Sequence, residues 1–173
     1  MIWGLLQPCN LLQSNYKLIK KRGVNVRAPY QVLIFPYYRS DRGIEYAIFH
    51  RSDADWWQAI SGGGEDGETI IESAKREAWE EGGISKDSLY VKLDTVNSIP
   101  AEEFADSIHW GEDVYVINEN CYGVEIIDKQ LKLSHEHTEY KWMNYNEAIS
   151  CLKWDGNKVA LWELNKRLGK KKV

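Results

Sequence analysis

The sequence has few cysteines, and their placement excludes a covalent framework. Cys9, Cys121 and Cys151 are widely spaced and odd in number. Small disulfide-stabilised proteins and zinc sites need more cysteines, at closer and regular spacings. We therefore expect three reduced, structural thiols in a protein of the cytoplasm.

Long apolar runs are also missing. The opening segment, residues 1–12, is apolar, but it lacks a basic lead-in and contains Pro8 and Asn10. It is too short to span a bilayer and does not resemble a secretion signal. No membrane partner is expected.

There is no excess of positive charge. The chain has 22 Lys and Arg against 26 Asp and Glu, a net charge of −4. Proteins that bind long nucleic acid mainly through its phosphates need a basic surface, so this class is not expected. A small anionic molecule is compatible with the charge if a metal ion neutralises it. The basic residues at 17–22 and in the tail leave RNA contact open as a lesser alternative.

The organisation is that of one globular domain. Hydrophobic residues make up 43% and charged residues 28% of the 173 residues, and no repeat or long linker divides the chain. We expect an N-terminal extension at 1–27, a domain at 28–168 and a basic tail at 169–173. A homodimer is left open.

Alternating strand patterns and helical patterns follow one another along the domain. The first two strands flank the turn-like residues 40–43 and predict a hairpin. The fold class is therefore α/β or α+β, with a mixed sheet flanked by helices. The predicted strands are 31–38, 45–50, 56–60, 91–98, 113–118 and 139–143, and the predicted helices are 69–81, 145–152 and 157–168.

The helix predicted at 69–81 has clear ends. Thr69 and Glu72 have the spacing of a capping box, and Gly82 and Gly83 follow as a stop signal. Its apolar face is formed by Ile70, Ile71, Ala74 and Ala78. This face predicts a helix packed on the sheet.

Three glutamates lie on one side of this helix. Glu77, Glu80 and Glu81 are three and four positions apart, so their like charges repel. Oxygen ligands at this spacing suit a hard cation such as Mg²⁺ or Mn²⁺. The alternative is a solvated acidic face paired with Lys75 and Arg76. The glycines at 62–64 favour the metal, since they let backbone groups approach a cation or a phosphate closely.

Residues 62–84, GGGEDGETIIESAKREAWEEGGI, resemble the Nudix box, Gly-x5-Glu-x7-Arg-Glu-U-x-Glu-Glu-x-Gly-U, where U is a bulky apolar residue. Ala78 is smaller than usual at its position, which concerns packing rather than chemistry. The matching residues are Gly62, Glu68, Arg76, Glu77, Glu80, Glu81, Gly83 and Ile84.

The resemblance implies a Nudix fold, an α/β/α sandwich with a central mixed sheet. It also implies that Glu77, Glu80 and Glu81 bind Mg²⁺ or Mn²⁺, together with the carbonyl of Ser61. Gly62, Glu68 and Gly83 would be structural positions of the box. Glu68 and Arg76 would brace the loop against the helix by an ion pair.

Segments outside the box, 50–62 and 135–142, look like the branch of this family that cleaves dATP and dihydroneopterin triphosphate. On that resemblance, Glu136 reaches the metals or the attacking water. Glu80, Glu136 and Arg76 are the catalytic candidates, and the general base is either Glu80 or Glu136. His135 and His137 are left unassigned.

Candidate substrate contacts come from arginine and tryptophan. Arg51, with Arg39 as a second choice, offers a planar guanidinium to phosphate. Trp56, Trp57 and Trp110 lie near the expected site loops, and one of them could stack on a base or a pterin ring; Trp57 and Trp110 are the first choices.

The expected activity is cleavage of a nucleoside or pterin triphosphate to a monophosphate and pyrophosphate. ADP-ribose or dinucleoside-polyphosphate hydrolysis, or nucleotide binding without turnover, are the alternatives. The expected partner is a small nucleotide-like molecule.

Overall fold

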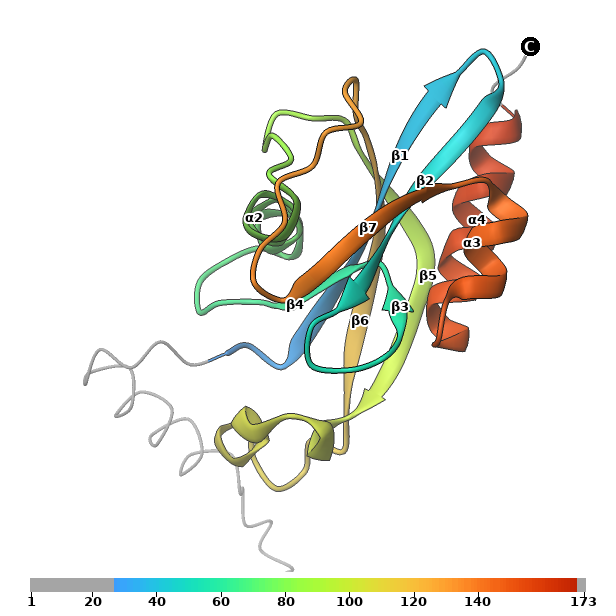
Figure 1. The fold of residues 1–173 in the computed structure, drawn as a ribbon. Helices are drawn as coiled ribbons and strands as arrows, with labels where there is room; N and C mark the ends of the chain where they lie inside the picture. The colour runs from blue at the N-terminus through green and yellow to red at the C-terminus, as the bar shows by residue number, and fades with distance from the viewer. Residues whose placement is uncertain (1–26, 171–173) are drawn as a thin grey trace, which may run out of the picture.

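The computed structural model describes residues 27–170, and the rest of the extension and the end of the tail, with Cys9, lie outside the described residues. A seven-stranded mixed sheet lies between α2 (Ile70–Gly82) on one face and α3 (Tyr145–Cys151) and α4 (Asp155–Lys170) on the other (Figure 1). The predicted α/β/α arrangement is confirmed. Within residues 27–170, no helix is both long and apolar enough to cross a membrane.

The centre of the sheet is a hairpin and a parallel neighbour. β1 (Tyr30–Ser40) and β2 (Gly43–Arg51) are antiparallel, as predicted, and Gly43 takes a φ of 123° in the turn. β6 (Val116–Glu125) runs parallel to β1, and β5 (Tyr90–Pro100) runs antiparallel to β6. This one parallel pair makes the sheet mixed.

The strand predicted at 56–60 is two short strands. β3 (Trp57–Gln58) pairs with β2, whereas β4 (Ile60–Gly63) pairs with β1. The chain crosses from one central strand to the other at Ala59, and β1 and β2 diverge here (Figure 1). β7 (His137–Met143) pairs with β2, as the last strand of the sheet.

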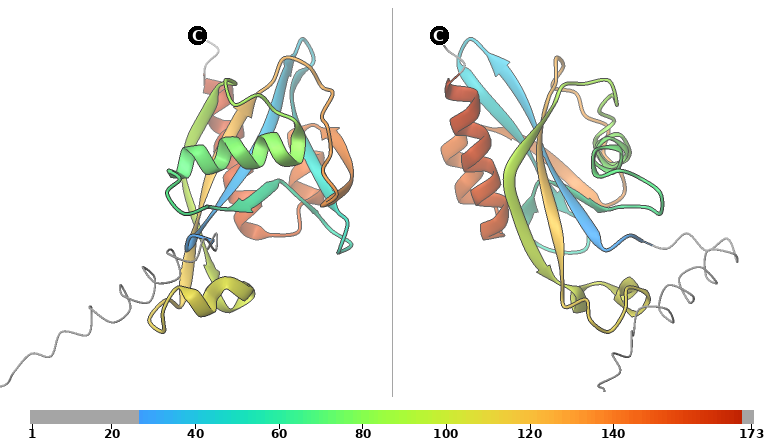
Figure 2. Two further views of the ribbon diagram at one scale, coloured as in Figure 1. Left: turned by 90° about the vertical axis from the view of Figure 1, so that its left-hand side faces the viewer. Right: turned by 180° about the vertical axis from the view of Figure 1, so that it is seen from behind.

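The prediction of a strand at 113–118 is wrong in its position. β6 begins at Val116 and continues to Glu125, while the preceding residues belong to a loop after two short 3₁₀ turns, η1 (Ala101–Glu103) and η2 (Ala105–His109). These turns lie together beyond the end of β5 (Figure 2). The later part of β6 is not predicted from the sequence, because the buried polar residues Glu119 and Asn120 interrupt the expected apolar alternation.

Helix α2 has the predicted ends. Thr69 and Glu72 form the capping box, and Gly83 closes the helix in a left-handed conformation with φ 66°. Ala74 and Ala78 pack against the sheet in one apolar core. The prediction of 69–81 is confirmed to within one residue.

The second core lies under α3 and α4. Leu161 and Leu164 of α4 pack on Leu33 and Phe35 of β1. A Cβ added at Gly123 would overlap Leu164, so α4 rests directly on the backbone of β6. The helix extends to Lys170, into the residues predicted as a tail.

The candidate active site

Arg76 joins the glycine loop to helix α2. Its guanidinium donates two hydrogen bonds to Glu68, at 2.8 and 2.9 Å, and one to the carbonyl of Gly63 at 2.7 Å. It also donates to Glu77 at 2.8 Å and to Glu80 at 3.2 Å. The bond from Arg76 lowers the pKa of Glu68 to about 2. Arg76 therefore holds three carboxylates and one carbonyl in a fixed arrangement.

Glycine at position 62 makes room for a carboxylate. A Cβ there would overlap the carboxylate of Glu77, which lies against the backbone of β4. Gly63 and Gly64 are covered in the same way by Arg27 and Tyr30. The glycines thus allow three side chains to lie directly on one strand.

Glu77 and Glu81 are buried on the inner side of α2, 8% and 2% exposed. Burial raises the pKa of Glu77 to about 7, and burial followed by the nearby Glu136 charge raises the pKa of Glu81 to about 8. Oε1 of Glu81 is buried and has no hydrogen-bond partner. Each carboxylate is therefore costly to keep ionised in this protein alone.

The second oxygen of Glu81 is hydrogen-bonded to His137. Oε2 lies 2.7 Å from Nε2 of His137, whose side chain is fully buried and packs on Phe49. Burial lowers the pKa of His137 to about 4, so the ring is neutral. Which atom donates in this bond depends on the His137 tautomer, and Nδ1 of the ring is buried without a hydrogen-bond partner. No sequence pattern distinguishes His137 from His135.

Glu80 and Glu136 are the more exposed carboxylates of the predicted set. The Glu80 side chain is 53% exposed and pairs with Arg76, while Glu136 is 39% exposed and pairs with Arg51 at 3.3 Å. Within residues 27–170, no three His, Cys, Asp or Glu side chains converge closely enough to form a ready metal cluster. Glu80 pairs with Arg76, and it is the buried, unpartnered oxygen of Glu81 that fits a cation.

A cavity of about 470 Å³ brings opposite charges together beside α2. Glu77, Glu81 and Glu136 line it, and so do Arg27 and Arg51. Asp53 holds Arg51 in place through bonds of 2.8 and 2.6 Å. The predicted ligand Ser61 and the box residue Gly62 also line this cavity. Neither Glu80 nor Arg39 lines it.

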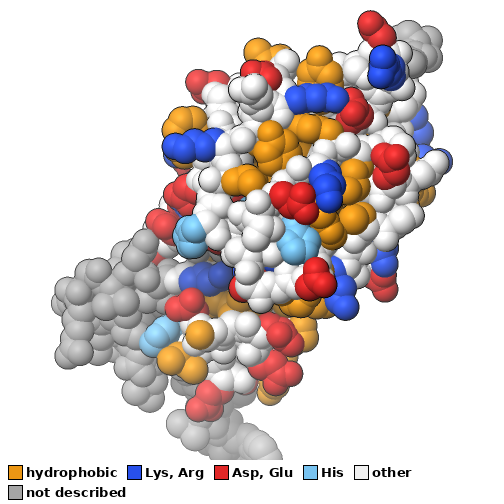
Figure 3. Space-filling view, in the orientation of Figure 1, with side chains coloured by type: hydrophobic (Ala, Val, Ile, Leu, Met, Phe, Trp, Pro, Cys, Tyr) orange, Lys and Arg blue, Asp and Glu red, His pale blue; other side chains and the backbone are white. Residues whose placement is uncertain are grey.

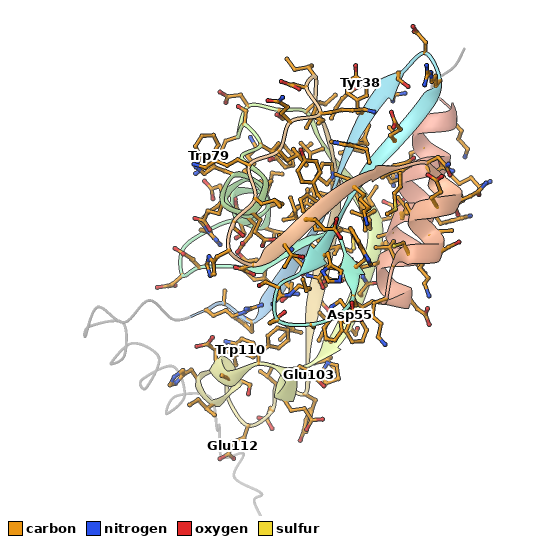
Figure 4. The ribbon with its side chains drawn as sticks, in the orientation of Figure 1. Tyr38, Asp55, Trp79, Glu103, Trp110 and Glu112 are labelled. Carbon is orange, nitrogen blue, oxygen red and sulfur yellow. The ribbon has the colours of Figure 1, made fainter. Side chains whose placement is uncertain are left out.

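The aromatic wall differs from the predicted one. Trp56, Phe104 and Trp154 line the cavity, whereas Trp57 and Trp110 do not. Trp57 instead packs on His50, with ring centroids 5.0 Å apart, and Trp110 donates from Nε1 to the carbonyl of Arg27 at 2.7 Å. Trp110 lies in the segment of 3₁₀ turns with Glu103 (Figure 4). Neighbouring residues of an extended chain point to opposite sides, so only one of Trp56 and Trp57 is expected to face the cavity. The sequence alone does not indicate which one.

Arg27 is a further site residue that the sequence did not indicate. Its guanidinium lies 4.5 Å over the ring of Phe104 and donates to Gln31, while its Nε is buried without a partner. It precedes the first strand, where no pattern marks it. Over the face seen in Figure 3, acidic and basic side chains are mixed.

The described geometry agrees with the family comparison. Residues 31–162 match the NUDIX domain. The chain belongs to the NUDIX family, and it is a hydrolase that acts on phosphoanhydride bonds.

The similar proteins include hydrolases with different substrates, so they do not identify the substrate of this protein. The chain is 26% identical over 137 residues to the dihydroneopterin triphosphate diphosphatase of Escherichia coli, covering 78% of this chain and 91% of that protein. It is 30% identical over 124 residues to the asymmetrical bis(5'-nucleosyl)-tetraphosphatase of Rattus norvegicus, covering 69% and 78%. A NUDIX hydrolase structure from Listeria monocytogenes matches with a TM-score of 0.75 and 39% identity, covering 83% and 96%.

Proposed function

We propose that the protein hydrolyses a nucleoside or pterin triphosphate to a monophosphate and pyrophosphate, with Mg²⁺ or Mn²⁺. The observation that carries this proposal is the pair of buried carboxylates, Glu77 and Glu81, in a cavity that also contains two arginines and three aromatic side chains. The carboxylates suit a cation, the arginines suit phosphates, and the aromatic side chains suit a flat ring. The activity in the name of the Escherichia coli relative agrees with this substrate class.

The residues that would hold the cation are Glu77, Glu81, Glu80 and the carbonyl of Ser61. The unpartnered oxygen of Glu81 favours this assignment, because a buried acceptor without a donor is otherwise unfavourable. Glu80 is exposed, so its side chain is free to leave Arg76. A bound divalent cation would neutralise charge on the phosphates and make water easier to deprotonate.

The protein's own cations would position the substrate. Arg27 and Arg51 line the cavity, and a guanidinium binds phosphate oxygens with a planar set of donors. Asp53 and Glu136 fix the direction of Arg51. His137 would keep Glu81 in place, since the 2.7 Å bond leaves only one carboxylate oxygen free.

We assign the general base to Glu136 rather than to Glu80. Glu136 lines the cavity beside Glu81, whereas Glu80 is outside the lining and pairs with Arg76. A general base must be within hydrogen-bond reach of the attacking water, directly or through one other water. Glu136 meets this condition better in the structure.

Hydrolysis in ¹⁸O-labelled water tests the reaction. With Mg²⁺ and dihydroneopterin triphosphate, GTP or dATP, we expect a monophosphate and intact pyrophosphate, identified by mass. Label in the monophosphate indicates attack at the α phosphorus, and label in pyrophosphate indicates attack at the β phosphorus. Orthophosphate as the main first product, or a clear preference for ADP-ribose, would contradict the proposal.

A dinucleoside polyphosphate is the second candidate. The rat tetraphosphatase relative supports it, and so do the three aromatic side chains of the cavity, Trp56, Phe104 and Trp154. Diadenosine tetraphosphate in the same assay separates the two candidates. A higher kcat/KM for it than for every triphosphate would favour the second.

A further inference from the structure

A second cavity, of about 390 Å³, adjoins the catalytic cavity. The two share Gln31, Gln58 and Ser61, and both are bordered by Phe104 and Trp154. The second cavity continues toward the first turn of α4, away from the carboxylates of α2. A molecule with its phosphates at Glu77 and Glu81 could therefore place its other end here.

A row of three polar residues lines this second cavity. Gln31, Glu119 and Asn97 are register partners on the adjacent strands β1, β6 and β5, so their side chains share one face. This face carries the core under α3 and α4, where Leu33 and Cys121 follow two residues further along. Polar residues replace the core at this end of the sheet.

Glu119 is buried, 5% exposed, and has no cationic partner within residues 27–170. Asn97 donates to Oε2 at 2.7 Å, while Gln31 and Ser61 donate to Oε1 at 3.4 Å each. A carboxylate has about four acceptor sites, so three bonds leave one site vacant on Oε2, and a ligand N–H can replace one of the two long bonds to Oε1. Gln31 is itself fixed by Arg27, which donates to its Oε1.

Another polar side chain of the cavity, Gln58, has no hydrogen-bond partner for its amide within residues 27–170. Gln58 is 9% exposed and lines both cavities, yet its amide group makes no hydrogen bond to any residue from 27 to 170. An amide that lines a cavity without a protein partner is available to a ligand, both as donor and as acceptor. Asn157 stands nearby with its Oδ1 accepting from the N–H of Ala59 at 3.3 Å, which leaves its NH₂ group as a donor.

We propose that the second cavity binds the 2-amino-4-oxopyrimidine edge that pterins and guanine share. Glu119 accepts the ring N–H and the amino N–H, and the amide of Gln58 donates to the ring oxygen. Phe104 and Trp154 flank the ring. This inference rests on the proposed function, since the triphosphate of the same molecule would lie in the catalytic cavity. Adenine would be disfavoured, because it presents an acceptor beside its amino group to the carboxylate.

The wild-type protein gives the first test, through kcat/KM for GTP, inosine triphosphate and ATP with Mg²⁺. Inosine triphosphate lacks only the 2-amino group, so we expect GTP to exceed it by about 10- to 100-fold, the effect of one hydrogen bond to a charged group. ATP should be no better than inosine triphosphate. Equal rates for GTP and inosine triphosphate, or a preference for ATP, would overturn the inference.

An assay of dihydroneopterin triphosphate beside GTP shows whether the second cavity prefers a pterin ring or a guanine ring. A higher kcat/KM for the pterin assigns the site to pterins, and a higher value for GTP assigns it to guanine. Either result supports the shared edge, provided that GTP also exceeds inosine triphosphate. If inosine triphosphate exceeds both, the inference fails.

The variant Glu119→Gln tests the residue. We expect the GTP-to-inosine-triphosphate ratio to fall to within about threefold of one, since the amide offers a donor where two acceptors are needed. Glu103→Gln is the matched control, because it removes an exposed carboxylate of the same cavity. It should keep the wild-type ratio. A wild-type ratio in folded Glu119→Gln, as judged by circular dichroism, would overturn the assignment.

Binding of GMP, IMP and AMP to the wild-type protein, without turnover, separates this inference from the proposed function. GMP should bind about 10-fold or more tightly than IMP. If that preference holds while no triphosphate is hydrolysed, the proposed function fails and the ring site stands. If triphosphates are hydrolysed while GMP and IMP bind equally, the ring site fails and the proposed function stands.

Discussion

At the scale of single residues, the three predicted metal-binding glutamates of α2 have different environments. Glu77 and Glu81 are buried against β4 and β7, whereas Glu80 is largely exposed beside Arg76. Changing a buried carboxylate alters packing as well as charge. Glu80 is therefore the residue at which metal binding is tested with the least disturbance of the fold.

Glu80→Gln should lower kcat by about 10²-fold or more with Mg²⁺, as expected when one strong electrostatic group is lost from a transition state. Its melting temperature should stay close to the wild-type value, because the side chain is exposed. Steady-state kinetics at saturating substrate and thermal unfolding measure the two. Glu139→Gln is the control, since Glu139 is an equally exposed acid paired with Lys141 on β7. Near-normal turnover of Glu80→Gln would contradict the metal assignment.

At the scale of elements, β4 and α2 are fitted to each other through glycine. The Glu77 carboxylate lies against Gly62, where a Cβ would overlap it. Arg76 then ties the same strand to the helix through the carbonyl of Gly63. The loop and the helix therefore act as one unit.

Gly62→Ala should destabilise this unit, because the added methyl group overlaps the Glu77 carboxylate. We expect a loss of about 1–3 kcal/mol in the free energy of unfolding, typical of overpacking, and a higher Mg²⁺ requirement for activity. Urea unfolding and Mg²⁺ titration of the rate measure these changes. Gly169→Ala is the control, since a methyl group there meets no atom within 4 Å. Equal stability of the two variants would show that the overlap is relieved without cost.

At the scale of the whole molecule, buried acids link stability to pH and to metal. The raised pKa values of Glu77 and Glu81, about 7 and about 8, exceed the ordinary value of 4.5. Their contribution to stability is complete below about pH 4.5 and is lost as pH rises through 7 and 8. Glu119, whose pKa burial also raises, acts in the same direction. His137, lowered from 6.5 to about 4, acts oppositely, but only below about pH 6.5.

Between pH 6.5 and 8.5, the melting temperature of the protein in EDTA should therefore fall as pH rises. Mg²⁺ should raise it more at pH 8.5 than at pH 6.5, since metal binding requires the ionised carboxylates. Thermal unfolding at several pH values, with EDTA and with Mg²⁺, measures both slopes. In Glu81→Gln the EDTA slope should be smaller. Parallel curves with and without Mg²⁺ would exclude the carboxylates as its ligands.

The described residues do not test the other predictions made for the whole molecule. The cytoplasmic location and the homodimer stay predictions, and residues 1–26 of the extension predicted at 1–27 lie outside the described residues. Cys121 and Cys151 are free thiols, the first of them buried.

The sequence by itself determined the features that depend on local spacing. The capping box of Thr69 and Glu72, the left-handed Gly83 and the one-sided acids of α2 all follow from a helical repeat within 15 residues. The sandwich class followed from the order of strands and helices.

Only the tertiary structure decided which distant residues complete the site. His137 meets Glu81 across 56 positions, Arg27 lies against Gly63, and Trp56 rather than Trp57 reaches the cavity. Each depends on strand register and on the crossing of the chain at Ala59, where a shift of one residue exchanges the two faces of a strand. The spacing within one helix carries no information on these pairings, because they arise from the packing of separate elements around two cavities.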